Sequence, residues 1–299
     1  MPHQRQKRRT RVIAIVGPTA SGKTSLGIEL ARAVGGEILS ADSRQVYRNM
    51  DIIAGTPSER EMRAVPHHML RVADPKRQYS AGTFVAASKK LIDQIAARGQ
   101  VPIVVGGTGL YAEALLAGWS LPEVVPNMKL RAQLGKKTPP QLWAQLRRLD
   151  PGRAAHIEKD NPVRLIRAIE IAKALGSVPP LTRTPPYDVL WIGLAPAADM
   201  HTQAIAVRTK LRLRRGMLGE AARLRASLSK KRFLRLGAEF QLLADQLDGK
   251  ISKKDLAEQL NTWEIAYAKR QVRWHRRNKE IVWISKNAEA ERLAKDFLS

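Results

Sequence analysis

The chain has 299 residues, and its 52 lysines and arginines against 27 aspartates and glutamates give a formal net charge of +25. Because it contains no cysteine, it can form neither disulfides nor thiolate metal sites, and no apolar run reaches the roughly 18 residues of a membrane-spanning helix. We therefore expect a cytoplasmic protein with no membrane partner. The excess of positive charge favours a nucleic-acid partner, because lysine and arginine release counterions from phosphates; a compositional bias without such a partner is the alternative.

The first third of the chain alternates between two kinds of pattern. The basic residues 1–10 hold no apolar segment of signal-peptide length, and we expect them to form a disordered tail. Apolar runs at 12–16, 37–40, 68–72 and 101–105 then predict strands, and periodic segments at 25–33 and 84–97 predict helices. This alternation is typical of an α/β fold in which a parallel sheet is flanked by helices.

The pattern changes after Tyr111, where prolines separate short helices up to about residue 184. Residues 142–149 predict one helix, and Asn161 before Pro162 predicts the start of another, at 163–175, as an N-cap followed by proline. The apolar run at 189–194 returns to strand character. We therefore expect residues 11–112 and 185–299 to form a core α/β domain, interrupted by an all-helical insertion domain at 113–184.

The last third is predicted to be mostly helical, with a final edge strand at 280–284. One apolar stripe at helical spacing, which we expect to face the core instead of stacking on bases, consists of Leu256, Leu260, Trp263, Tyr267 and Trp274. Basic side chains gather between Lys269 and Arg277. We expect them to contact nucleic-acid phosphates, and a solvated helix face is the alternative.

Residues 17–24 (GPTASGKT) fit the phosphate-loop pattern G-x-x-x-x-G-K-[ST] between a predicted strand and a predicted helix. Glycines allow backbone N–H groups to turn towards an anion, Lys23 adds a positive charge, and Thr24 offers a hydroxyl to Mg²⁺. We expect a diphosphate-like anion here, with Mg²⁺ as the cofactor. Nucleotide hydrolases also carry an acidic residue after an apolar strand, whereas the run at 101–105 is followed by Gly-Gly-Thr.

Asp42 is the acidic residue placed best for chemistry. It follows the predicted strand at 37–40, which in many such folds lies next to the strand that feeds the phosphate loop, and ligands bind beyond the carboxyl ends of such strands. A carboxylate there can accept a proton from a nucleophile. The alternative is an Asx-type turn or a helix cap, and the local sequence does not decide between the two.

Several motifs in order along the chain resemble those of the tRNA dimethylallyltransferase (isopentenyltransferase) family. Besides the phosphate loop, they are SADSRQVY at 40–47, PHHML at 66–70, VGGTGLY at 105–111, DNPVRLIRAIE at 160–170 and KRQVRW at 269–274. The resemblance implies a P-loop NTPase-like fold that binds dimethylallyl diphosphate and the anticodon stem-loop of a tRNA. It further implies transfer of the dimethylallyl group to N6 of the adenosine 3′-adjacent to the anticodon, giving N6-isopentenyladenosine and diphosphate.

The resemblance also implies roles for individual residues. Asp42 would act as general base and Thr108 would lie near the reacting centre. The diphosphate would be bound by Gly17, Thr19, Ala20, Ser21, Gly22, Lys23, Thr24 and Arg208, with Arg212, Arg214 and Arg215 as alternatives to Arg208. The tRNA would be contacted by Asp42, Ser43, Arg44, Gln45, Val163, Arg164, Leu165, Ile166 and Arg167.

Two features leave alternatives open. Arg164 and Arg167 lie three apart, so they share a helix face, and locally a solvated face or a bond to Glu170 is the alternative to RNA contact. The family often has a Gly-Tyr pair where this chain has RLGAEF at 235–240, which leaves tRNA contact by that segment open. We expect the protein to act as a monomer.

Three other functions compete with this interpretation: a small-molecule kinase, an enzyme that prenylates free adenine nucleotides, and a non-catalytic RNA-binding module. The missing strand-end acid and the net charge of +25 disfavour the kinase. The predicted helical insertion disfavours a free nucleotide as acceptor. The intact set of Lys23, Thr24 and Asp42 disfavours the non-catalytic module.

Overall fold

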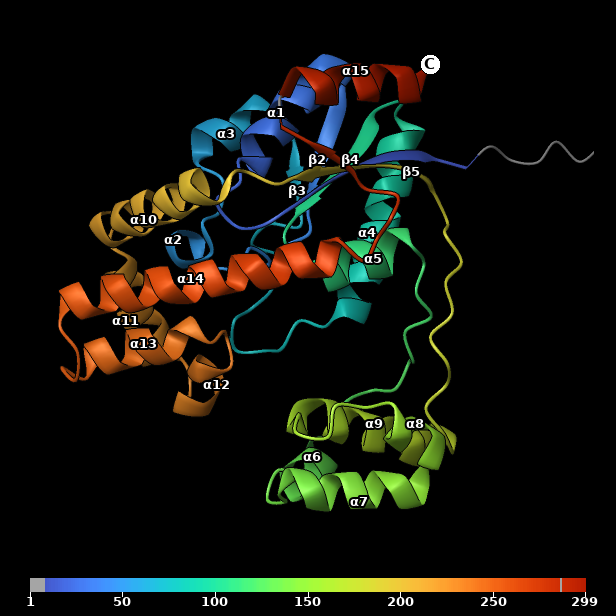
Figure 1. Ribbon diagram of the computed structural model, residues 1–299, viewed down its shortest axis with the longest axis vertical. Helices are drawn as coiled ribbons and strands as arrows, with labels where there is room; N and C mark the ends of the chain where they lie inside the picture. The colour runs from blue at the N-terminus through green and yellow to red at the C-terminus, as the bar shows by residue number, and fades with distance from the viewer. Residues whose placement is uncertain (1–8, 286) are drawn as a thin grey trace, which may run out of the picture. The chain divides into compact units, whose positions relative to one another are not determined.

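The computed structural model describes residues 9–285 and 287–299 (Figure 1). Most of the predicted tail at 1–10 therefore lies outside the described residues. The chain divides into two compact units, the first made of the segment up to Gly118 together with Pro185–Ser299, and the second of Trp119–Thr184. The second unit begins later than the expected residue 113, because helix α5 (Gly109–Leu116) packs its buried side chains into the core of the first unit.

The first unit is built on a six-stranded sheet with the order β3-β2-β4-β1-β5-β6, and every strand pair is parallel. The central strand β1 pairs Ile13 with Ile103 of β4 on one side and with Leu190 of β5 on the other. The strands are β1 (Arg11–Val16), β2 (Gly36–Ser40), β3 (His67–His68), β4 (Val101–Gly106), β5 (Asp188–Leu194) and β6 (Val282–Ile284). The predicted α/β fold with a parallel sheet is confirmed.

The sheet has helices on both faces, because the side chains of its strands point alternately to opposite sides. Ile13 and Ile15 of β1 belong to a core cluster that includes residues of α1 (Lys23–Val34) and α15 (Asn287–Leu298). Val12 and Val16 belong to a second cluster with residues of α4 (Ala81–Ala97) and α5. This two-sided burial explains why the strands are apolar runs without alternation.

One predicted strand is largely wrong. Residues 68–72 were expected to be a strand, but β3 ends at His68. Met69 and Arg71 adopt positive φ angles of 63° and 55°, a left-handed conformation that interrupts strand pairing. The backbone instead turns so that the amide of Arg71 donates to the carbonyl of Gln45 at 2.9 Å, which ties this segment to the loop after β2.

The carboxyl-terminal part of the first unit is mostly helical. Its longest helix, α14 (Lys253–His275), contacts α10, α13 and α5. The remaining helices of the unit are α2 (Asp51–Ala54), α3 (Glu59–Ala64), α10 (Ala198–Arg214), α11 (Met217–Ser227), α12 (Lys230–Leu234) and α13 (Glu239–Leu247). Within the residues described, no helix has the length and apolar character needed to cross a membrane.

The second unit consists of four short helices and one isolated antiparallel bridge between Trp119 and Arg183. The helices are α6 (Met128–Leu134), α7 (Pro139–Leu149), α8 (Pro151–Ala155) and α9 (Pro162–Leu175). Leu142 and Leu146 of α7 are fully buried against α9, which gives the unit a core of its own. The predicted N-cap is present, because the Asn161 side chain accepts a hydrogen bond from the backbone amide of Arg164 at 3.2 Å.

Candidate active site

The phosphate loop connects β1 to α1 in a conformation that depends on its glycines. Gly17 has a φ of 146°, and a Cβ atom there would lie 2.6 Å from the carbonyl oxygen of Leu194. Gly22 forms the N-cap of α1 with a φ of 86°, and no side chain caps this helix end. The first amide groups of α1 therefore have no side-chain acceptor, and uncapped helix amides of this kind are suited to binding an anion.

Lys23 begins α1, and its side chain folds back over the loop. Its Nζ donates to the carbonyl of Pro18 and lies 3.4 Å from the hydroxyl of Ser21. Burial lowers the pKa of Lys23 from 10.5 to about 7, and the positive charge of Arg208 lowers it as well, whereas Asp42 acts in the opposite direction. The negative charge near Lys23 is therefore too small to offset burial and the nearby Arg208. An anion bound in the loop would favour the charged form of Lys23.

Three arginines line the same cavity: Arg208 and Arg212 of α10, and Arg44 of the loop after β2. Arg208 of α10 donates to the hydroxyl of Thr19 in the phosphate loop, and burial lowers the pKa of its guanidinium. Arg212, one turn further on, forms an ion pair with Glu264 of α14, and burial together with the charges of Arg208 and Arg44 lowers its pKa to about 9. The alternatives to Arg208 at positions 214 and 215 are exposed to solvent.

These groups line one cavity of about 210 Å³ in the first unit. The predicted site residues on its wall are Thr19, Ala20, Ser21, Gly22, Lys23, Thr24, Asp42, Arg44, Gln45 and Arg208. Gly17, Ser43 and Thr108 do not line it but lie in the same loops. The structure therefore brings the predicted diphosphate-binding residues and the predicted base together, although they come from three separate parts of the chain.

Asp42 fits both interpretations of its role. Its Oδ1 accepts the backbone amide of Arg44 at 2.8 Å, which is the Asx-type turn. Across the described parts of the chain, no recorded hydrogen bond involves its Oδ2, and the side chain lines the cavity together with Lys23. One carboxylate oxygen thus fixes the turn while the other is available to a ligand.

The strand order that brings Asp42 to the cavity differs from the expected one, in which the strand before Asp42 lies next to the strand that feeds the phosphate loop. Strand β2 is not next to β1, because β4 lies between them. The end of β2 nevertheless comes close to the end of β4, since Gly106 has no side chain: a Cβ atom there would overlap the backbone of Ala41. The amide of Thr108 donates to the carbonyl of Ala41 at 3.2 Å, which joins the two strand ends.

Thr108 is held beside the Asp42 turn. It is the N-cap of α5, but its hydroxyl makes no capping bond. Instead, Thr108 Oγ1 accepts the backbone amide of Ser43 at 3.0 Å and lies 3.3 Å from the Ser43 hydroxyl. Thr108 is therefore fixed directly behind the predicted base.

Sequence reasoning misplaced two aromatic residues. Trp263 and Tyr267 were expected to face the core, but both are only partly buried and line the cavity. Their rings are stacked, with centroids 5.2 Å apart and an interplanar angle of 9°, and the Arg44 guanidinium lies 5.9 Å from the Trp263 ring. The apolar stripe on α14 therefore packs into the core at Leu256 and Leu260, whereas at Trp263 and Tyr267 it lines the cavity.

Sequence reasoning also missed three polar residues that line the cavity. Glu239 pairs with Arg44, Glu264 pairs with Arg212, and Gln271 accepts the backbone amide of Thr19 at 2.8 Å. The segment at 235–240 thus holds Arg44 in place, since Gly237 also leaves room for that guanidinium. The one available signal was that Gln271 continues the spacing of Trp263 and Tyr267 along the helix.

The residues present fit a magnesium ion that is held partly by substrate. Thr24, the residue predicted to bind the ion, lines the cavity beside the phosphate loop and offers a hydroxyl oxygen. Over residues 9–285 and 287–299, no group of three or more histidine, cysteine, aspartate or glutamate side chains could hold a metal on its own. Mg²⁺ is typically bound by one or two such oxygens together with phosphate oxygens and water.

The predicted tRNA-binding segment of α9 divides into buried and exposed residues. Leu165 is fully buried in the core of the second unit, so its side chain does not face the surface that an RNA would meet. Ile166 packs against the same core and is partly buried. Val163 is 76% exposed, and Arg164 is exposed with an ion pair to Glu158 at 3.2 Å.

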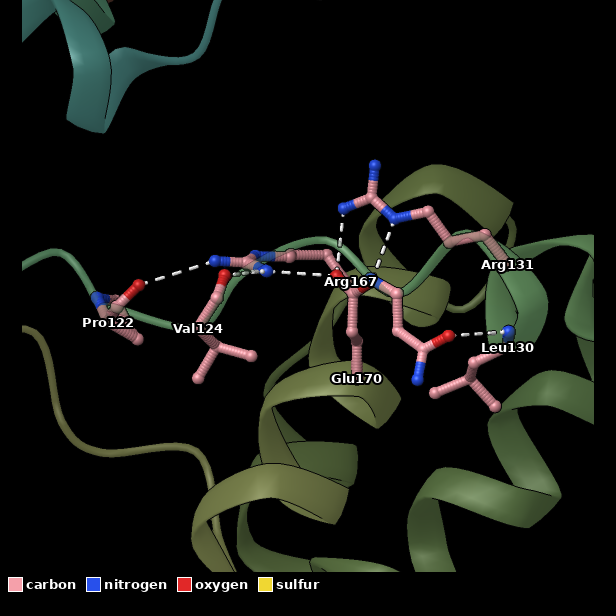
Figure 2. Close-up of polar contacts among 7 residues, drawn as sticks. Pro122, Val124, Leu130, Arg131, Arg167 and Glu170 are labelled. Carbon is pink, nitrogen blue, oxygen red and sulfur yellow. Dashed lines mark hydrogen bonds and ion pairs between the residues drawn. The ribbon is translucent and has the colours of Figure 1, made fainter.

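Arg167 is held by its own unit. Figure 2 shows its guanidinium donating to the carboxylate of Glu170 at 2.8 Å and to the carbonyl of Val124 at 2.9 Å. Glu170 is 2% exposed and also accepts two hydrogen bonds from Arg131, at 2.9 and 2.8 Å. The bond to Glu170 that was the alternative for Arg167 is therefore present, and Arg167 connects α9 to the loop before α6.

Comparison with known proteins places this architecture in a family. A model of the family described as IPP transferase matches residues 45–278. The chain belongs to the IPP transferase family. The tRNA dimethylallyltransferase of Thermomicrobium roseum is 38% identical over 286 residues, which is 92% of this chain and 86% of the relative. The family resemblance seen in the motifs is therefore confirmed.

Two solved structures resemble this IPP transferase family member over nearly its whole length. The full-length tRNA isopentenylpyrophosphate transferase of Bacillus halodurans has a TM-score of 0.72 and 31% identity, and covers 97% of this chain and 96% of its own. A eukaryotic dimethylallyltransferase described as acting on tRNA has a TM-score of 0.81 and 25% identity, and covers 97% of this chain and 79% of its own. These similarities confirm the expected P-loop NTPase-like fold.

Proposed function

We propose that this protein is a tRNA dimethylallyltransferase that prenylates N6 of the adenosine 3′-adjacent to the anticodon. One observation carries the proposal: the phosphate loop with Lys23 and the carboxylate of Asp42 line a single cavity. A phosphate cradle alone would suit many enzymes. A carboxylate beside it suits a reaction in which one group loses a proton while a diphosphate departs.

On the side of the leaving group, the chain supplies positive charge and backbone amides. The amides at the start of α1 have no side-chain acceptor, and Lys23, Arg208 and Arg212 line the same cavity. As the bond between the prenyl carbon and the diphosphate oxygen breaks, the electron pair stays on the diphosphate. These groups stabilise the negative charge that develops on the diphosphate. They therefore lower the free energy of the transition state more than that of the bound substrate, and the reaction is faster.

On the side of the acceptor, Asp42 takes the proton. The exocyclic N6 of adenine is a weak nucleophile, and its attack on the prenyl carbon leaves a positive charge on nitrogen. Transfer of that proton to the Asp42 carboxylate as the C–N bond forms contributes roughly 10²–10⁴-fold to the rate. The turn bond from the Arg44 amide to Oδ1 keeps the carboxylate aimed while Oδ2 accepts the proton.

Bound Mg²⁺ would neutralise part of the diphosphate charge, and Thr24 is the residue placed to hold it. The cavity wall also offers two stacked aromatic rings, Trp263 and Tyr267, which suit a flat base or a prenyl group. The target adenine has to leave the stack of the anticodon loop to reach such a cavity, at a cost of about a few kcal/mol.

The surface of the first unit supports an RNA partner. Exposed basic side chains at the end of α14 are Lys269, Arg270, Arg273, Arg276 and Arg277. Such groups contact backbone phosphates and position an RNA without reading its bases. In the second unit, Val163 and Arg164 are the exposed members of the predicted tRNA-binding segment, so contact through α9 is proposed for these two. We further propose that the protein acts as a cytoplasmic monomer.

The proposal is tested with two anticodon stem-loops that differ only in the nucleotide after the anticodon, adenosine in one and guanosine in the other. Each is incubated with Mg²⁺ and dimethylallyl diphosphate labelled in its prenyl carbons, and a parallel reaction contains ATP labelled in its terminal phosphate. We expect the prenyl label on the adenosine RNA alone. Phosphate label on either RNA, or prenyl label on both, would overturn the assignment.

A further inference from the structure

The phosphate loop and the turn that carries Thr108 are tied together by one side chain from a distant helix. Gln271 lies on α14, is almost fully buried, and makes two hydrogen bonds of 2.8 Å. Its Oε1 accepts the backbone amide of Thr19, and its Nε2 donates to the carbonyl of Gly107, the residue before Thr108. We propose that Gln271 is a positioning residue that fixes the spacing between the diphosphate cradle and Thr108.

The turn at 107–109 is shaped to receive α14. A Cβ atom on Gly107 would overlap the side-chain amide of Gln271, and one on Gly109 would overlap the ring of Trp274. Gln271 and Trp274 lie on the same face of α14, since residues three apart are neighbours on a helix. The two glycines thus let the helix lie directly against the turn, and Thr108 between them is the residue whose side chain points to Ser43.

The hydrogen bond between Gln271 and the Thr19 amide also determines which backbone amides of the phosphate loop are available to a diphosphate. The Thr19 amide donates to Gln271, and its carbonyl lies 2.7 Å from Nε2 of His201, so the backbone of this residue is bound on both sides. This amide is therefore not available to a diphosphate. The side chain of Thr19 turns to Arg208, which brings that arginine into the cradle.

A spacing role follows from the chemistry of the proposed function, on which this inference rests. Prenyl transfer needs the departing diphosphate and the attacking nitrogen on opposite sides of one carbon. Gln271 bridges the phosphate loop, which is proposed to hold the diphosphate, and the turn that carries Thr108. That turn lies beside Asp42, which is proposed to take the proton from the nitrogen. A misplacement of about 1 Å can lower a rate by roughly 10²-fold even when the substituted residue does not touch the substrate.

The test compares Gln271→Met, which keeps the size of the side chain and removes both hydrogen bonds, with Gln259→Met, a matched change at an exposed position of the same helix. We expect Gln271→Met to lower kcat about 100-fold and to leave the KM for the stem-loop unchanged. In a Thr108→Ala background the same substitution is expected to lower kcat less than about tenfold, because its effect acts through Thr108.

Equal kcat values for the two methionine variants, or effects of Gln271→Met and Thr108→Ala that multiply fully, would overturn the positioning role. If Gln271→Met does not fold, Gln271→Glu decides: it keeps the oxygen that accepts from Thr19 and loses the donor to Gly107. We expect the same fall in kcat, and normal turnover of that variant would contradict the inference. Absence of transfer by the unsubstituted protein would count against the proposed function instead.

Discussion

Lys23 and Asp42 line the same cavity, although one begins helix α1 and the other follows strand β2. They come together because β4 ends in Gly106 between them, where the missing side chain lets the chain at Ala41 cross close to the strand end. Asp42 also opposes the fall in the pKa of Lys23. The lysine proposed to bind a diphosphate thus lies within the electrostatic reach of the carboxylate proposed to accept a proton.

The substitution Asp42→Asn should separate the two roles of this residue. The side-chain amide oxygen of the variant can still accept the backbone amide of Arg44, so the turn is kept, but the side chain no longer accepts a proton. We expect kcat to fall roughly 10²–10⁴-fold, with unchanged affinity for the stem-loop. Single-turnover kinetics and filter binding measure the two quantities. Turnover within a few-fold of the unsubstituted protein would remove Asp42 from the mechanism.

Binding of inorganic diphosphate should take up a proton through Lys23. In the free protein, the pKa of Lys23 is about 7, so the side chain loses its charge as the pH rises above that value. A bound anion favours the charged form, so one proton is taken up on binding above pH 7 and the affinity falls as the pH rises, by up to about tenfold per pH unit.

Calorimetry in buffers with different ionisation enthalpies measures this uptake, with Lys23→Met as the control, because diphosphate also titrates in this range. The difference in proton uptake between the two proteins is the contribution of Lys23. Identical uptake by the two proteins from pH 7 to pH 9 would show that Lys23 keeps its charge in the free protein.

Binding to the stem-loop should weaken steeply with salt. The exposed basic residues at the end of α14 are expected to replace counterions on RNA phosphates. Substituting Arg273 by alanine should weaken binding for every RNA sequence and reduce the slope of log K against log salt by about one. Glu258→Ala, at an exposed position near the other end of α14, serves as the control. An unchanged slope for Arg273→Ala would place the RNA elsewhere.

The stability of the second unit should depend on the buried carboxylate of Glu170. Burial raises the pKa of this carboxyl, but the hydrogen bonds from Arg131 and Arg167 outweigh burial and leave the pKa below its usual value. The stabilising contribution is therefore present at neutral pH and is lost as the pH falls through the lowered pKa. We expect Glu170→Gln to lower the free energy of unfolding of this unit by about 3 kcal/mol at neutral pH.

Limited proteolysis between α6 and α9 measures that change, and Glu158→Gln is the matched control. Glu158 pairs with Arg164 on the exposed surface at 3.2 Å, and such a pair contributes at most about 1 kcal/mol. Cleavage of the two variants at the same rate would mean that the contacts drawn in Figure 2 do not hold the unit together.

The parts of the fold that could be predicted from sequence are those with a local signal. The apolar runs gave the strands β1, β2, β4 and β5 because both faces of the sheet are covered, and the N-cap Asn161 marked the start of α9. The end of strand β3 at His68 could not be predicted, since the residues that follow, Met69 and Arg71, have positive φ angles in a segment that is hydrogen-bonded to the distant loop after β2.

In the candidate site, too, residues within a continuous motif could be predicted, whereas residues brought in by distant contacts could not. The phosphate loop is a continuous motif, so its residues were found directly, whereas Arg208 entered through a resemblance in spacing. Trp263 and Tyr267 were assigned to the core because periodicity locates an apolar face but cannot tell whether a core or a cavity lies against it. Glu239 contacts a loop far away in sequence, and no local pattern distinguishes it from other polar residues on a helix. Gln271 also contacts a distant loop, and its only sequence signal is the helical spacing that it shares with Trp263 and Tyr267.

The account is tested most directly by following both halves of the substrate in one single-turnover reaction. Dimethylallyl diphosphate labelled in its prenyl carbons and, with a second isotope, in its phosphorus is mixed with the protein, Mg²⁺ and an adenosine-containing stem-loop. We expect the carbon label to appear on N6 of the RNA at the same rate as the phosphorus label appears in free diphosphate. Phosphorus on the RNA, or release of both labels into solution without a modified base, would contradict it.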